Sequence, residues 1–179
     1  MRTQAKKRKP VHRLPSDRQF LPAINERDLF KRIIRTHQLI EKALVRGIVK
    51  RLVEPGALEM SIIPFPLKVN LAIALGMLPP VYGPPLLKVN AMRNAFAHNP
   101  ATRVTPEKAM DLWNCVPPYT QQSLMETFRR KFSLDPRSII NMVFGVMFLD
   151  VKSLARRKST EKYQSVPYFN AVSISTSPT

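Results

Sequence analysis

One segment of the chain brings together side chains that suit phosphate binding and proton transfer. Its polar residues recur at the three- and four-residue spacing that places side chains on one side of a helix: Asn90, Arg93, Asn94 and His98. The guanidinium of Arg93 offers a planar fork of donors that matches phosphate oxygens, and His98 can exchange a proton near neutral pH. Asn94 adds an amide beside the arginine. This combination indicates chemistry on a phosphodiester.

An alternative interpretation of the same residues needs no ligand. In it, Arg93 and Asn94 lie on a solvated helix face, and His98 stabilises the negative end of the helix dipole. An arginine and a histidine five residues apart also form a short pattern that is common by chance. Spacing alone leaves both interpretations open.

Two polar residues interrupt an apolar stripe near the start of the chain. A helix is predicted from a cap at Asn25 to Glu54, where Pro55-Gly56 ends it. Its stripe consists of Phe30, Ile34, His37, Glu41, Leu44, Ile48 and Leu52. Burying His37 or Glu41 without a partner would cost a few kcal/mol. Either these two residues, four apart, bond each other or the backbone, or they face a polar cleft.

Further helices are predicted over residues 66–77, 86–98, 105–117, 120–132 and 136–157, with a rigid proline-rich turn over 79–85. Thr105 and Asp135 each precede a proline, which is typical of a capped helix start. No stretch alternates strictly between apolar and polar residues, and only 5 glycines are present for hairpin turns. The predicted fold is all-α, a compact up-and-down helical bundle.

The predicted organisation is a single domain with two polar ends. Residues 1–22 read as a flexible basic arm, 23–158 as the helical domain, and 159–179 as a polar tail that we expect to be disordered. The net charge is +17. The first 20 residues hold seven bases and one acid, so a net +11 remains on the rest. Nucleic acid is the expected partner of such a chain, although solvated Lys and Arg also serve solubility.

Cysteine usage and hydropathy predict a cytoplasmic protein that does not span a membrane. Cys115 is the only cysteine, so no internal disulfide forms, and the start of the chain lacks an apolar signal. The most apolar stretch, residues 139–149, is shorter than the roughly 20 residues that cross a bilayer. It therefore reads as a core or interface helix. Three scattered histidines and one cysteine predict no metal site and no cofactor.

The string from Asn90 to Asn99 resembles the Arg-polar-x-x-x-His signature of the HEPN superfamily. These are helical bundles of prokaryotic toxin and antiviral systems and of some host-defence nucleases. The motif Arg-Asn-x-Phe-Ala-His is also similar to a motif of the mannitol operon repressor family, a HEPN-like group associated with regulation. The resemblance implies a HEPN-like fold and a metal-independent endoribonuclease in which the ribose 2′-hydroxyl attacks its phosphate. It implies that Arg93 stabilises the phosphate, His98 transfers protons and Asn94 positions both.

In-line attack benefits from one group that takes a proton and one that gives it, yet this segment has one histidine. A two-fold homodimer would supply two, and pairing of these segments is common among HEPN-like domains. His37 and Glu41 then gain a supporting role, with Glu41 orienting Arg93 by a paired hydrogen bond. Some toxin members carry a tyrosine two residues after the histidine, where this chain has Asn99-Pro100. Neutralisation by modification at that site is therefore unsupported.

Two other function classes fit the same residues. One is a non-catalytic HEPN-like transcriptional regulator, in which Asn90, Arg93 and His98 only hold RNA, another ligand or a regulatory or antitoxin partner. The other is a helical interaction protein whose basic arm binds nucleic acid without specificity, through counterion release. RNA is the expected partner of the endoribonuclease hypothesis.

Overall fold

The computed structural model describes residues 14–99, 101–129 and 133–157. Seven α-helices and two short 3-10 helices, with no strand, make up these described residues, which confirms the all-α prediction. The 3-10 helices are η1 (Pro55–Ala57) and η2 (Pro80–Tyr82). The α-helices are α1 Asp17–Ile24, α2 Leu29–Val49, α3 Phe65–Ala74, α4 Gly83–His98, α5 Pro106–Asn114, α6 Pro118–Thr127 and α7 Pro136–Arg156.

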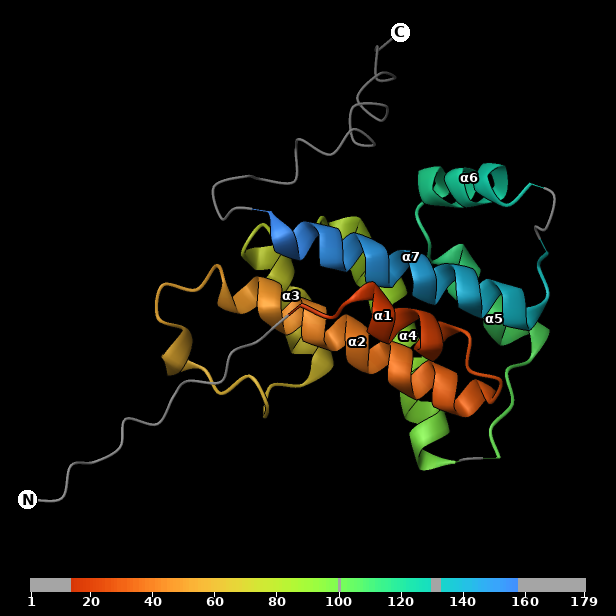
Figure 1. Ribbon diagram of the computed structural model, residues 1–179, viewed down its shortest axis with the longest axis horizontal. Coiled ribbons are helices and arrows are strands. Elements are labelled where there is room, and N and C mark those ends of the chain that lie inside the picture. Colours follow the sequence, from red (N-terminus) through yellow and green to blue (C-terminus); the bar gives the residue numbers. More distant parts are fainter. Residues whose placement is uncertain (1–13, 100, 130–132, 158–179) are drawn as a thin grey trace, which may run out of the picture.

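The two longest helices, α2 and α7, lie side by side and form the centre of the arrangement (Figure 1). By length and hydropathy α7 is long and apolar enough to cross a membrane, and 56% of its most apolar window is buried inside the structure. Its contacts with α2 and α5 account for that apolar character. The expectation of a core helix over residues 139–149 agrees with this packing.

Polar contacts join α2 and α7 at both ends. Near their starts, Arg32 is buried and donates from Nη1 to the Asn141 side chain at 2.7 Å. At the other end, Lys50 Nζ donates to the carbonyls of Arg156 and Arg157, each at 2.7 Å. These last carbonyls of α7 have no partner within the helix, so the lysine satisfies them.

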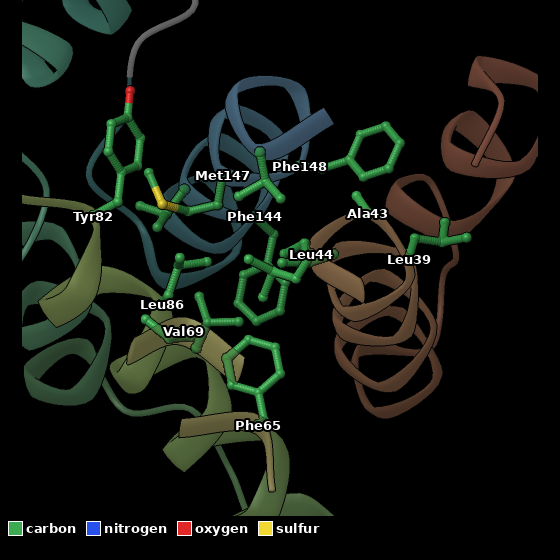
Figure 2. Close-up of a cluster of buried hydrophobic side chains, with 14 of the residues drawn as sticks. Leu39, Ala43, Leu44, Phe65, Val69, Tyr82, Leu86, Phe144, Met147 and Phe148 are labelled. Carbon is green, nitrogen blue, oxygen red and sulfur yellow. The ribbon is translucent and has the colours of Figure 1, made fainter. Parts of the chain in front are cut away.

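The core lies between α2, α3, the start of α4 and α7. Figure 2 shows the side chains of Leu44, Phe65, Val69, Leu86 and Phe144 converging from these elements. Each is among the buried residues of its own helix. The core therefore fixes how far α4, which carries the candidate site, can rotate against α2.

The flexible arm predicted for residues 1–22 does not extend to residue 22, because helix α1 occupies the last part of that range. It begins at Asp17 after a capping box formed by Ser16 and Gln19. Phe20 is buried and stacks on Phe148 of α7, with ring centroids 4.1 Å apart and planes 7° apart. The sequence did not predict this helix, because a single buried aromatic ring in a segment that contains proline does not produce a recognisable apolar periodicity. Residues 1–13, and the predicted tail over 159–179, lie outside the described residues.

Several helix boundaries differ from the predicted ones for local reasons. Helix α2 begins after Asp28, whose carboxylate accepts the amides of Phe30 and Lys31, while Asn25 closes α1. It ends at Val49 instead of Glu54. Helix α3 ends at Ala74, and Gly76 follows with a φ of 65° that favours glycine.

The proline-rich segment is also more helical than predicted. The expected turn over 79–85 ends at Tyr82, and Pro84 and Pro85 belong to the first turn of α4. Prolines fit there because the first amides of a helix have no intrahelical acceptor to lose. Helix α6 stands apart from the other helices in Figure 1. It runs from Pro118 to Thr127, with Phe128 as its C-cap, so it begins and ends earlier than the predicted helix over 120–132.

Candidate functional site

The last three turns of α4 carry the predicted site, but its residues do not share one side. Successive residues of an α-helix are about 100° apart, so His98 lies roughly 140° around the axis from Arg93. Asn90 and Arg93 are half-buried, whereas His98 is exposed. The predicted single polar face of Asn90, Arg93, Asn94 and His98 is therefore wrong. Asn90 and Arg93 lie against the body of the protein, whereas His98 faces solvent.

Arg93 is held by its neighbour in sequence. Its Nη1 donates to the Asn94 side-chain oxygen at 3.0 Å, which fixes one edge of the guanidinium. Its Nε is buried and has no hydrogen-bond partner among the described residues. A buried donor without a partner costs free energy, so a ligand oxygen or a water molecule reaching it would be stabilising. The Asn94 side chain therefore restrains the orientation of the Arg93 guanidinium.

His98 is exposed in the final turn of α4, which extends past α2 at the lower edge of Figure 1. The helix end is closed by other groups: the Ala95 carbonyl accepts from the Asn99 amide at 3.1 Å and from the Thr102 hydroxyl at 3.1 Å. Capping of the Ala95 carbonyl therefore does not require the imidazole. His98 remains accessible to a substrate or to another chain.

His37 is the opposite of His98 in its surroundings. It is 2% exposed, its Nε2 lies 3.2 Å from the side-chain oxygen of Asn90, and its ring lies 4.4 Å from that of Phe65. Burial lowers the pKa of His37 to about 4, with a further lowering from Arg93 and an opposing effect of Glu41. His37 is therefore neutral at physiological pH. Its Nδ1 is buried without a hydrogen-bond partner in the described part of the chain.

Glu41 pairs with a residue that the sequence had not singled out. Its Oε1 accepts a short hydrogen bond from Nζ of Lys68, whose side chain is 5% exposed against 31% for Glu41. The prediction that Glu41 orients Arg93 is wrong, because this carboxylate is engaged by α3. The interpretation in which His37 and Glu41 bond each other is wrong too, since each bonds a residue of another helix.

Lys68 could have been found from its register in α3. It shares a helix face with Phe65, Val69 and Ala72, all buried, at spacings of three and four residues. A lysine on such a face must carry its charge to a counter-ion or a cavity, because an unpaired buried ammonium is costly. Predicting that the partner is Glu41 requires the relative rotation of α2 and α3, which no local pattern contains.

The last turns of α4 combine an arginine restrained by Asn94, an exposed imidazole, and a buried contact between Asn90 and His37 of α2. An arginine fixed on one edge can present its remaining donors to a phosphate, and an exposed histidine can transfer protons. Among the described residues, no group of three or more His, Cys, Asp or Glu side chains could hold a metal ion. No protein-family model, curated protein sequence or solved structure matches this chain.

Proposed function

We propose that the chain is a metal-independent endoribonuclease of HEPN type, with a compact up-and-down HEPN-like bundle as its fold. Arg93 binds the scissile phosphate, Asn94 positions the guanidinium, and His98 transfers protons. The same proposal places the protein in the cytoplasm as a homodimer that binds RNA and does not associate with a membrane. It also includes a role in defence or in a toxin–antitoxin pair.

The observation that carries the proposal is that the last turns of α4 hold both an Arg93 restrained by Asn94 and an exposed His98. The Asn94 contact limits the orientations of the guanidinium, and such positioning lowers the cost of binding a phosphate in one geometry. The accessible imidazole supplies the group that moves protons. The buried His37, neutral with a pKa of about 4, acts instead behind the site by fixing Asn90.

The reaction needs two proton transfers. The 2′-oxygen forms a bond to phosphorus as its proton passes to a base, and the bond to the 5′-oxygen breaks as that oxygen receives a proton from an acid. The products are a 2′,3′-cyclic phosphate and a 5′-hydroxyl. One His98 per chain fills one of these roles. A second copy across a two-fold axis supplies the other, with the two arginines stabilising the phosphorane charge between them.

The test is cleavage of a mixed RNA pool by the purified protein in EDTA. We expect His98→Ala to lower the cleavage rate on the order of 10²- to 10⁴-fold, the usual contribution of a proton-transfer group. His12→Ala is the matched control, because it removes a histidine from outside α4. Equal cleavage by the wild type and His98→Ala would assign the activity to a contaminant and remove the nuclease proposal. Sedimentation over a broad concentration range tests the dimer.

A second candidate is a non-catalytic regulator or nucleic-acid-binding module. The observation that favours it is that Asn90 points its side-chain oxygen at His37 and Arg93 bonds Asn94, so both residues already have intramolecular roles. In this case the same assay finds RNA binding without cleavage, and His98→Ala weakens RNA binding because His98 belongs to the face that holds the ligand.

A further inference from the structure

A pocket of about 1020 Å³ opens on the side of α2 that carries Glu41, away from the α4 motif. Its walls come from the start of α1 and the residues before it, from α2, from the segment before α3, and from α3 itself. None of Asn90, Arg93, Asn94 or His98 lines it. Its volume slightly exceeds the range that is usual for small-molecule sites, roughly 300–1,000 Å³.

The charged residues of the pocket are arranged with an excess of positive charge. The buried Lys68 pairs with the half-buried Glu41 as described above, and Lys42 is exposed on α2 beside them. Lys68 neutralises Glu41, so the charge of Lys42 is the one left for a ligand. An ion pair buried in a protein is weak as a source of stability compared with apolar residues of similar size. Its place on a pocket wall points instead to recognition of a polar group.

The remaining wall has both hydrogen-bonding and apolar surface. Gln38 and Ser61 are exposed neutral polar residues that can donate to or accept from a ligand. Val45 and Met60 are buried and present apolar atoms, which suit a hydrocarbon or ring. Polar and charged residues make up most of the lining, and the apolar residues Val45 and Met60 add a smaller hydrophobic wall.

We propose that this pocket binds a small organic anion, whose carboxylate or phosphate faces Lys42 and whose apolar body lies against Val45 and Met60. Gln38 donates to the same anionic group or to a polar substituent. Charge complementarity disfavours the preceding segment of the chain as occupant. Residues 1–13 contain six basic residues and no acid, so they match the positive pocket poorly.

The proposal is tested with phenyl phosphate and benzoate, which join an anion to a ring, by isothermal titration calorimetry on the full chain. Inorganic phosphate and benzyl alcohol are the anion-only and ring-only probes. We expect saturable binding of at least one ring-bearing anion with a Kd below about 1 mM. Both single-feature probes should bind at least about tenfold more weakly, because each lacks one half of the complementary surface.

Two exposed positions allow the pocket to be altered without disturbing the core. Lys42→Glu reverses the free charge and should weaken the anion on the order of tenfold, and Gln38→Trp should obstruct entry at unchanged charge. Lys108→Glu is the matched control, since it makes the same charge change on an exposed residue of α5 outside the pocket. Thermal unfolding of each variant establishes that it is folded.

Absence of saturable binding by both ring-bearing anions overturns the proposal. It is equally overturned if Lys42→Glu and Lys108→Glu lower affinity by the same factor, because net charge and not the pocket would then be responsible. RNA cleavage does not enter this experiment. A failure here therefore leaves the proposed nuclease activity standing, and loss of the nuclease proposal leaves the pocket proposal standing.

Discussion

The two described histidines show how burial decides what one residue type can do. His37 lies in the core, bonded to Asn90 and with its ring tilted against that of Phe65, and its imidazole stays neutral until the pH is close to 4. His98 lies at the surface at the end of α4. Only the exposed ring can reach a substrate, whereas the buried ring ties α2 to the helix that carries the candidate site.

The buried His37 predicts a pH-dependent stability. Its pKa of about 4 in the folded chain is below the ordinary 6.5, so between these values the unfolded chain binds the proton more tightly. The stabilising contribution is therefore complete above pH 6.5 and is lost as the pH falls from 6.5 through 4. A shift of this size corresponds to about 3 kcal/mol.

The measurement is the free energy of unfolding of the wild type and of His37→Gln by denaturant titration at several pH values. The difference between the two proteins should shrink by a few kcal/mol, or reverse, on acidification, because only the wild type must charge a buried imidazole. Burial raises the pKa of Asp150, so its contribution falls as the pH rises, but it is common to both proteins. Parallel pH profiles would show that His37 does not cause the acid sensitivity.

At the scale of elements, the close approach of helices depends on particular small or flat side chains. A Cβ atom added at Gly47 of α2 would lie 2.4 Å from Met77 Sδ and 2.9 Å from Ala155 Cβ of α7. The glycine thus lets α2 approach both neighbours. The same applies to α1, which rests on the flat stacking of Phe20 against Phe148.

Removing the Phe20 ring should release α1 from the bundle. We expect Phe20→Ala to lower the free energy of unfolding by about 3 kcal/mol, the usual cost of truncating a buried phenylalanine. Leu21→Ala is the matched control, because the adjacent side chain is 55% exposed and should change stability by less than about 0.5 kcal/mol. Equal effects of both substitutions in urea unfolding would mean that α1 is not docked through Phe20.

At the scale of the whole molecule, the dominant property is the net charge of +17 on 179 residues. The charge is shared between the first 20 residues and the rest, so no single segment accounts for it. A polyanion bound to such a chain releases counterions, and the affinity then depends strongly on salt.

RNA binding should therefore weaken steeply as salt is added. If roughly three or more phosphates are contacted, raising the salt from about 50 to about 200 mM should weaken binding on the order of tenfold or more. Fluorescence anisotropy with a labelled single-stranded RNA measures this slope. An affinity independent of salt would exclude phosphate contacts as the basis of binding. The slope is a property of association and is read independently of cleavage.

The sequence by itself determined the all-α class, the approximate positions of six helices, and the capped starts at Thr105 and Asp135. These features depend on interactions within three or four residues, which a local pattern contains. It also identified His37 and Glu41 as polar residues on an apolar stripe, where each side chain requires a hydrogen-bonding or charged partner.

Only the tertiary structure determined which residues are the partners of His37 and Glu41. Asn90 lies 53 residues from His37 and Lys68 lies 27 residues from Glu41, so each pair depends on how two helices rotate against each other. The same rotation turns Arg93 towards the body of the protein and leaves His98 in solvent. Spacing along one helix specifies angles around its own axis, but the packing of the core sets which angle faces a neighbour.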